Sequence, residues 1–494
     1  MYAMIATLFA SVVQLYATPF GLVRHAPQAM INMHSPLSGS VLVAQALHAG
    51  KIRLPFYYRP SLGEILTCTP TPCTVPNVQA SEGGQPVNET PLAANPVNRR
   101  QMLSGGNDYN CSNTQGFFAS HDGGSTWNHT CFGNLPGSFG VGDPNVGYNT
   151  TGMSFTDGID QVSGTVSNIA LEHSTNGGTT WSSPSLAVSG ISPYTFVDKP
   201  WLQIDDSAAS PRKDTMYIST TDFDPNSNSA MVVSHSTNKG ATWTSVMVDA
   251  VAMPLVDQFT DLAIGSDGAV YLSWMRCSAT GPTGDCGGTT SAIMFSKSTD
   301  GGVTWTVPKM IAAANLTPDS CGAYYGCLPN TPERVSNVPP IDVDRSGGQF
   351  NNHLYVAYYN FTGAQMQVNV VNSADGGATW SSPVRVTHAI NDEFFPWLTT
   401  NAKGFVGVSW LDRRLDPSNV NYDAFAAVSR NGGAHFAAGV RLSTVSSNPF
   451  NDGFGGGFMG DYTGGIWVKN TLFAVWTDTR NGVDGQDEIG GLKL

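Results

Sequence analysis

The sequence is poor in charged side chains, which make up only 12% of its 494 residues. Basic side chains are the scarcer sign, with 24 Lys and Arg against 37 Asp and Glu, and they form no basic stripe along the chain. The net charge of −13 therefore argues against a nucleic-acid partner and against binding to an anionic membrane surface. The abundant residues are instead glycine and proline, 54 and 30 of them, which is typical of many short strands joined by tight turns.

Long apolar runs are also scarce, and the only one at the N-terminus reads MYAMIATLFASVVQLYATPFG. No basic residue precedes this run, because the first one in the chain is Arg24. The run resembles the core of an export signal, so we expect residues 1–23 to be a signal peptide, with a membrane anchor or a misassigned start as alternatives. No later segment is long and apolar enough to cross a bilayer. We therefore expect a secreted protein, extracellular or at the cell surface, without a membrane span in the mature chain.

Eight cysteines fall into four pairs that are close in sequence. An even number of cysteines in loop-rich segments, after an export-like start, favours disulfide bonds. Proximity alone suggests the pairs Cys68/Cys73, Cys111/Cys131, Cys277/Cys286 and Cys321/Cys327. A zinc site is the weaker interpretation, because no histidine stands at ligand spacing from these pairs.

One motif, Ser-x-Asp/Asn-Gly-Gly-x-x-Trp, recurs six times, starting at Ser120, Ser174, Ser236, Ser298, Ser373 and Ser429. Each copy follows a strand-like run such as SAMVVSH, so the motif is expected to be the tip of a hairpin. The Asp or Asn side chain accepts hydrogen bonds from the turn, and glycine supplies a positive φ. Lys239 replaces one glycine and Phe436 replaces one tryptophan, which indicates a structural role and no catalysis.

This repeat resembles the Asp-box, or bacterial neuraminidase repeat, of the sialidase-like superfamily. The resemblance implies an all-β fold, a β-propeller of four-stranded antiparallel blades with Asp-box turns, over residues 88–494. A second pattern, an acidic residue followed by a short β run, recurs with the first and favours seven blades, with six as the alternative. Residues 24–87 form an N-terminal extension, and we expect the ring-closing strand from its SVLVAQAL or RLPFYY segment.

In such a propeller the starts of the inner strands and the ends of the second strands lie on one face, opposite the Asp-box turns. That face is expected to gather acidic, basic and aromatic side chains suited to a polar ligand such as a sugar. The predicted ligand-binding residues are Asp143, Lys199, Trp201, Trp397, Asp412, Asp461 and Asp478. The sequence W-x-D-x-R occurs twice, however, ending at Arg414 and Arg480, and a salt bridge between blades is the competing interpretation.

The sialidase resemblance also implies catalytic roles. Tyr462 would be the nucleophile with Glu393 as its partner, Asp198 or Asp143 would be the acid/base, and Arg480 with Arg413 or Arg414 would hold a sugar carboxylate. The sequence departs from the family pattern because its first inner strand, ETPLAANP, has no arginine.

Asp222, Asp224 and Asn226 alternate oxygen ligands in the manner of a calcium loop, although no EF-hand glycine or distant glutamate follows them. No cofactor is required, and calcium is the one candidate.

The sequence therefore leaves three functions open. The first is a secreted glycoside hydrolase of exo-sialidase type that acts on terminal acidic sugars. The second is a non-catalytic propeller that binds glycans or proteins, and the third is a structural subunit of an extracellular assembly. A carbohydrate or glycoprotein is the expected partner, and the sequence does not specify the oligomeric state.

Overall fold

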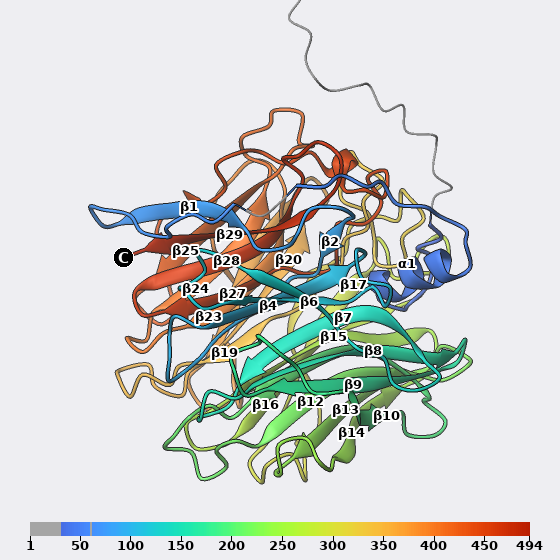
Figure 1. Cartoon of the computed structure of the whole chain (residues 1–494), viewed down its shortest axis with the longest axis horizontal. Helices are drawn as coiled ribbons and strands as arrows, with labels where there is room; N and C mark the ends of the chain where they lie inside the picture. The colour runs from blue at the N-terminus through green and yellow to red at the C-terminus, as the bar shows by residue number, and fades with distance from the viewer. Residues whose placement is uncertain (1–30, 60–61) are drawn as a thin grey trace, which may run out of the picture.

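Strand pairing in the computed structural model divides the chain into seven antiparallel sheets, which are the blades of a β-propeller (Figure 1). The structure describes residues 31–59 and 62–494. The expectation of seven blades is thereby confirmed. The predicted signal peptide lies outside the described residues, and no helix among those described has the length and apolar character needed to cross a membrane.

Blades 1 to 4 follow one another along the chain, each from the innermost strand outward. Blade 1 has its inner strand split in two, because β2 and β3 both pair with β4. The strands are β2 (Val87–Asn88), β3 (Leu92–Ala94), β4 (Met102–Asp108), β5 (Gly116–Ser120) and β6 (Asn128–Cys131); β7 (Phe139–Tyr148), β8 (Ser154–Ser163), β9 (Val166–Ser174) and β10 (Ser185–Ser189); β11 (Phe196–Ile204), β12 (Met216–Phe223), β13 (Ser229–Ser236) and β14 (Thr244–Val251); β15 (Leu255–Ile264), β16 (Val270–Ser278), β17 (Thr290–Ser298) and β18 (Lys309–Asn315).

Blades 5 to 7 complete the ring, and the last blade combines both ends of the chain. A short 3-10 helix, η1 (Pro449–Asn451), lies in the loop before blade 7. The strands are β19 (Ile341–Val343), β20 (Leu354–Phe361), β21 (Met366–Ser373) and β22 (Val384–Arg385); β23 (Glu393–Thr400), β24 (Val406–Asp412), β25 (Asp423–Ser429) and β26 (Val440–Arg441); β27 (Gly464–Val468), β28 (Thr471–Asp478), β29 (Gln486–Lys493) and β1 (Cys73–Gln79).

The register of each blade fixes which ends of its strands share a face. In blade 3, Ile204 at the end of the inner strand pairs with Met216, which pairs with Ser236 at the start of a repeated turn. The ends of the inner strands and the repeated turns therefore lie on one face, the turn face. The starts of the inner strands lie on the opposite face, as the sequence predicts.

The repeated turns are held by hydrogen bonds within each motif. In the third copy, Ser236 Oγ accepts from Gly240 N at 2.9 Å and donates to Asn238 Oδ1 at 2.9 Å. Asn238 Oδ1 also accepts from Thr242 N at 2.9 Å, and Gly240 has a φ of 81°. The side chains of the motif are thus used in shaping the turn, which agrees with a structural role.

The ring closes through β1, whose residues pair with β29 from Cys73↔Lys493 to Gln79↔Glu488. Both segments proposed for this role are wrong. SVLVAQAL belongs to the helix α1 (Gly39–His48), and residues 53–58 form no strand. The helix forms because its apolar side chains bury one face against the propeller, whereas β1 pairs with the free edge of β29 and buries Val75 and Val78 on either side of a bulge.

Residues of β1 close a hydrophobic seam between the first and last blades. Val75 and Val78 are 2% and 1% exposed and pack in one cluster with Val87, Phe118 and Ile489. This seam buries apolar surface that the edge of β29 would otherwise expose to water.

We expect Val78→Asp to open this seam. A charge placed there has no partner, so the free energy of unfolding should fall by roughly 3 kcal/mol or more. Thr74→Asp on the exposed side of the same strand is the matched control and should stay within about 0.5 kcal/mol of the parent. Urea unfolding followed by circular dichroism measures both. Equal losses in the two variants would contradict closure by β1.

Candidate functional site

Five inner strands carry a bulge at the same level of the propeller. At this level Glu89, Asp143, Lys199, Phe259 and Phe395 all have positive φ, between 47° and 64°. The strand registers shift at the same places, for example between Asp198 and Trp201. A left-handed conformation costs free energy at residues other than glycine, so its repetition indicates a constraint that the fold imposes. Three of these five side chains are charged, and all three are fully buried.

Four carboxyl groups meet at the starts of the inner strands, and we call them the carboxylate cluster: Glu89, Asp143, Asp198 and Asp461. All four residues are 0% exposed. Arg334, from the long loop between β18 and β19, donates to Asp461 through Nε at 2.8 Å and through Nη2 at 3.0 Å. One guanidinium group thus compensates one carboxylate, and the other three have no buried cation bonded to them among the described residues.

Glu89 is a buried carboxyl group beside Asp143. Burial, followed by the charge and hydrogen bonding of Asp143, raises the pKa of Glu89 well above its ordinary value. A protonated Glu89 can donate to Asp143, and two facing carboxyl groups are stable in this form because they do not both ionise. Burial and the Asp143 carboxylate likewise raise the pKa of Asp198 to about 7. The cluster therefore contains a held proton and a carboxyl group that titrates near neutral pH.

The mouth above the cluster is covered by the first described segment of the chain. Ser38 donates to Asp198 through its N–H and its Oγ, both at 2.8 Å. Gly39 N donates to Asp461 Oδ2 at 2.9 Å, and Ser40 Oγ donates to Asp143 Oδ1 at 2.8 Å. The first turn of α1 thus supplies the donors that the carboxylates need, and Figure 1 shows this helix at one end of the sheets, on the right, with the C-terminus at the other.

Lys199, Trp201 and Tyr462 form the layer beneath the cluster. Lys199 Nζ lies 3.9 Å from the centre of the Tyr462 ring and 4.6 Å from that of Trp201. Burial, then the Glu89 and Asp143 carboxylates, raise the pKa of Tyr462 well above its ordinary value. The phenol is therefore held in its protonated form, which is opposite to the activation that a nucleophilic tyrosine needs.

A separate cavity of about 510 Å³ enters the channel from the turn face. Trp201 and Trp397, whose ring centres are 4.8 Å apart, lie at its inner end. Its walls are the second halves of the inner strands, and its rim includes Arg345 paired with Asp206. The two tryptophans were predicted inside the channel, and the structure places them between this open cavity and the covered cluster.

The arginines predicted to converge do not meet Tyr462. Arg414 Nε donates to Asp412, and Trp410 Nε1 donates to the same carboxylate at 2.7 Å. Arg480 and Trp476 repeat this arrangement on Asp478. Each W-x-D-x-R unit is therefore a local ion pair. Arg414 extends this network to Thr387 and Arg480 extends it to Thr444, both in the loops that lead from the preceding blade. These ion pairs do not agree with the prediction that Arg480 with Arg413 or Arg414 holds a sugar carboxylate, because Asp412 and Asp478 already bind Arg414 and Arg480.

Arg413 and Glu393 also turn away from Tyr462. Arg413 Nη1 donates to the carbonyl of Pro329 and lies 3.6 Å from Asp392. The Glu393 carboxylate accepts from Val368 N at 3.2 Å and from Arg414 at 3.4 Å. The structure thus brings together Asp143, Asp198, Lys199, Asp461 and Tyr462 of the predicted residues.

One cluster member, the arginine that binds the cluster and the cover were missed from the sequence. Glu89 stands at the start of the first inner strand, in the same pattern as Asp143. Comparison of the inner-strand starts could therefore have identified it as a site residue. Arg334 is in an irregular loop, and Ser38 and Ser40 precede every repeat, so no pattern in the chain connects them with the channel.

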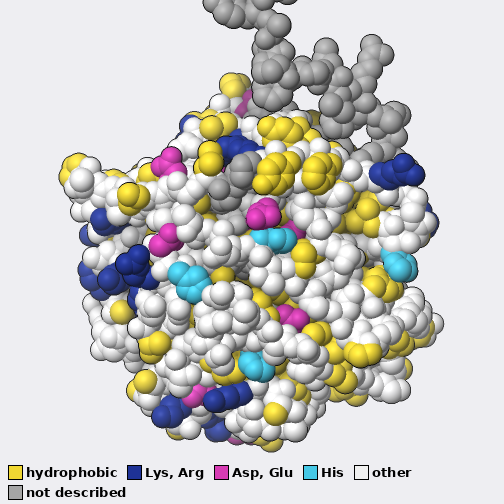
Figure 2. Space-filling view, viewed as in Figure 1, with side chains coloured by type: hydrophobic (Ala, Val, Ile, Leu, Met, Phe, Trp, Pro, Cys, Tyr) yellow, Lys and Arg dark blue, Asp and Glu magenta, His cyan; other side chains and the backbone are white. Residues whose placement is uncertain are grey.

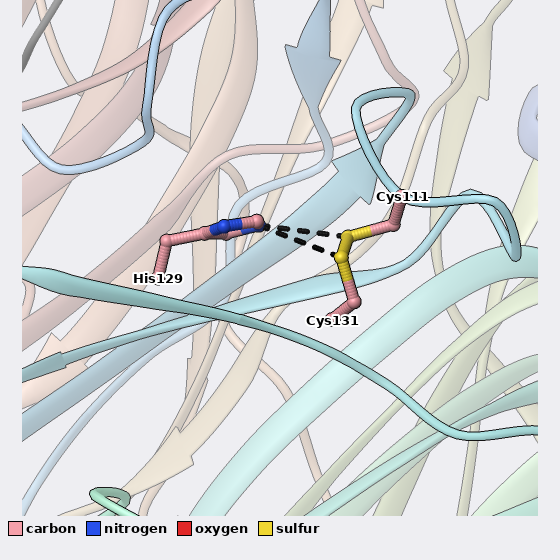
Figure 3. Close-up of side chains that lie close together, drawn as sticks. All are labelled: Cys111, His129 and Cys131. Carbon is pink, nitrogen blue, oxygen red and sulfur yellow. Dashed lines mark hydrogen bonds between the residues drawn. A yellow bond between two sulfur atoms is a disulfide. The ribbon is translucent and has the colours of Figure 1, made fainter.

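The four disulfide pairs proposed from proximity are confirmed: Cys68–Cys73, Cys111–Cys131, Cys277–Cys286 and Cys321–Cys327. The statement that no histidine accompanies them is wrong for one pair. Figure 3 shows His129 directed at the Cys111–Cys131 disulfide, with Nε2 at 3.5 Å from Cys111 Sγ. Nε2 also lies 2.6 Å from Asp108 Oδ2. Disulfide sulfur is not a thiolate ligand, so this contact does not constitute a zinc site.

Asp224 of the proposed calcium loop shapes its own turn, accepting from Asn226 N at 2.8 Å and Asn228 N at 2.9 Å. Asp222 is buried in β12 and accepts from Thr220 Oγ1 at 2.7 Å. These hydrogen bonds use some of the side-chain oxygen atoms that were proposed to bind calcium. Calcium binding there stays a prediction.

No protein-family model and no curated protein sequence matches the chain. Among solved structures, an ulvan lyase aligns at 11% identity over 82% of this chain and 93% of its own, with a TM-score of 0.49. A Hadza microbial sialidase aligns at 13% over 80% and 73%, with a TM-score of 0.45. An α-L-arabinofuranosidase from Fusarium graminearum aligns at 14% over 70% and 93%, with a TM-score of 0.46. The blade count rests on the strand pairing of this chain itself.

Buried carboxyl groups make stability depend on pH. Burial raises the pKa of Asp157 and Asp222 to about 7 and that of Asp261 to about 8. The folded state therefore holds protons between about pH 4 and pH 7 that the unfolded state releases. The free energy of unfolding should fall as the pH rises through this window.

We expect the free energy of unfolding, measured with urea, to be higher at pH 5 than at pH 8. Asp157→Asn should reduce this difference between the two pH values by roughly 1–4 kcal/mol. Asp224→Asn is the control with opposite sign. Burial by itself would raise the pKa of Asp224, but hydrogen bonds from Asn228 and Asn226 outweigh it and lower that pKa. The Asp224→Asn variant should therefore show no increase in the free energy of unfolding at pH 8. A pH profile unchanged by Asp157→Asn would refute the assignment.

Proposed function

We propose that this protein is a secreted, sialidase-like propeller that acts on carbohydrate, and that its sugar site is the carboxylate cluster. The proposal rests chiefly on the buried carboxyl groups of Glu89, Asp143 and Asp198, which lie together in the cluster. Glycoside hydrolysis needs one carboxyl group that delivers a proton and another that accepts one. Burial raises the pKa of Glu89 and that of Asp198, so both groups can hold a proton at a pH where free carboxyl groups are ionised.

The chemistry assigned to these groups is as follows. Glu89 donates its proton to the glycosidic oxygen as the bond between that oxygen and the anomeric carbon breaks. Water forms the new bond to the anomeric carbon, and its proton passes to the ionised Asp198. Asp143 holds Glu89 in its protonated form, and Asp461 with Arg334 binds ligand hydroxyl groups. Lys199 and Tyr462 line the inner side of the site.

The charge of the cluster favours a neutral sugar over an acidic one. Arg334 is the cation hydrogen-bonded to it among the described residues, and Asp461 already occupies two of its nitrogen atoms. A sugar carboxylate would face the Asp143 and Asp198 carboxyl groups, against which stand Arg334 Nη1 and Lys199 Nζ, two buried cationic nitrogen atoms without a hydrogen-bond partner in the described part of the chain. The terminal acidic sugar of the sialidase prediction is therefore not the substrate that we propose.

A second candidate function is non-catalytic glycan binding. It is favoured by the covered mouth and by the protonated state of Tyr462. The same neutral sugars would bind, but no glycosidic bond would break.

A panel of fluorogenic glycosides tests the proposal. We expect turnover of one or more neutral arabinosyl, galactosyl or rhamnosyl substrates, and none of the N-acetylneuraminic acid substrate. The protein should be assayed intact and after cleavage between Gly63 and Glu64 at an inserted site for a specific protease. Glu89→Gln should lower kcat by 100-fold or more, since general acid catalysis contributes about 10²–10⁴-fold.

Asp478→Asn is the control, because Asp478 binds Arg480 at the edge of its blade. Its kcat should stay close to that of the parent. Binding of neutral sugars without turnover would favour the non-catalytic function. Turnover of the sialoside, or an active Glu89→Gln variant, would reject the assignment of the site.

A further inference from the structure

We propose that residues 31–52 are a tethered plug that competes with ligand, and that the hydroxyl groups of Ser38 and Ser40 take the places of two neighbouring hydroxyl groups of a neutral sugar. This inference rests on the proposed function and adds to it the ligand class and the control of access.

The two serine hydroxyl groups have the geometry of a diol. Ser38 Oγ and Ser40 Oγ are 3.0 Å apart, comparable to adjacent hydroxyl groups on a sugar ring. Ser38 Oγ donates to Asp198 and Ser40 Oγ to Asp143, each at 2.8 Å. The pair thus bridges carboxylates from two neighbouring blades, as a diol with one donor on each oxygen would.

The rest of the contact is also made of donors. The N–H groups of Ser38 and Gly39 bind Asp198 and Asp461 at 2.8 and 2.9 Å. These groups belong to the first turn of α1, where the helix dipole is positive and favours nearby anions. The plug therefore brings no negative charge to the cluster, which matches a neutral ligand and excludes an acidic one.

The buried carboxylates need these donors or substitutes for them. Without residues 38–40, Asp198 loses two donors and Asp143 loses one. Asp198 keeps donors from Gln258 Nε2 and from the Lys199 N–H, each at 2.9 Å. A neutral donor that replaces the lost hydrogen bonds should therefore bind at the open mouth. Plug and sugar are thus expected to exclude each other by mass action.

Apolar contacts hold the plug in place beside these hydrogen bonds. Val41 and Val43 are fully buried, and Val43 packs in a cluster with Phe454 and Phe458 of the loop before blade 7. Gly39 lies so close to Phe458 that an added Cβ would be 2.0 Å from its ring. Val41 and Ala44 also pack in the main core cluster with Val141 of β7, so release of the plug exposes apolar surface of α1 and of the channel.

The connection from the plug to the propeller is a partly exposed linker held by a few backbone hydrogen bonds. Tyr57 N donates to the Gly84 carbonyl and Gly83 N to the Arg59 carbonyl, and both bonds must open when the plug leaves. Residues 53–59 and 62–72 form no helix or strand, and Phe56, Tyr58, Leu62 and Ile65 are 68–73% exposed. In Figure 1 this segment runs across the upper side from α1 to β1, and Figure 2 shows hydrophobic side chains gathered there. The ring is closed by β1, which follows the linker. The plug can therefore leave while the ring stays closed.

The test uses the full chain with the protease site between Gly63 and Glu64. After cleavage, native mass spectrometry follows how fast the N-terminal fragment leaves the propeller. We expect Ser38→Ala with Ser40→Ala to release it at least ten times faster than the parent. Ser35→Ala is the matched control, because Ser35 lies in the same segment and bonds the backbone of Leu37. D-galactose and L-arabinose should speed release, and N-acetylneuraminic acid should not.

The possible results distinguish failure of the plug from failure of the proposed function. If the double alanine variant releases the fragment no faster than Ser35→Ala, the plug does not act through the carboxylates and this inference is wrong. If uncut protein binds neutral sugars as well as cut protein, the plug is again rejected while the proposed function stands. If the fragment leaves in a serine-dependent way but no sugar binds, the proposed function fails and the sugar mimicry fails with it.

Discussion

Burial of charge at the centre of the ring is the constraint on which the rest of the structure depends. Seven inner strands meet around one axis, and their bulges turn Glu89, Asp143 and Lys199 into a region without exposed surface. Carboxyl groups placed there must share protons, bind a cation or receive hydrogen bonds. The raised pKa of Glu89 and the ion pair of Arg334 with Asp461 meet part of this requirement, and donors from residues 38–40 meet another part.

The same constraint separates the two ends of the channel. On the face of the inner-strand starts, polar groups are concentrated and covered by donors from residues 38–40. On the turn face, a cavity of about 510 Å³ is open, and its lining combines aliphatic and aromatic side chains with the charged residues Arg99, Asp206, Asp261, Asp342, Arg345 and Lys469. Trp201 and Trp397 separate the two. Chemistry is therefore assigned to the covered end, where proton positions are controlled, and access to that end becomes the functional question.

Local patterns were enough to predict much of the fold. The six turn motifs bond within about five residues, so their sequence alone specifies them, and the alternating strand runs between them predict the blades. The four disulfides join cysteines that are close in sequence and were predicted for that reason. The ring-closing strand was misplaced, because an apolar run such as SVLVAQAL suits a helix or a strand until its packing surface is known.

Alone, the sequence determined the repeat and the face on which acidic residues gather, and it favoured seven blades over six, since each depends on short-range periodicity. Only the tertiary structure decided the partners of those residues. Arg414 and Arg480 bind carboxylates two residues before them, because those anions are nearer than the channel. Ser38 meets Asp198 across 160 positions of sequence, and Gly39 meets Asp461 across 422. Contacts at such separation follow from closure of the ring, which no local pattern encodes.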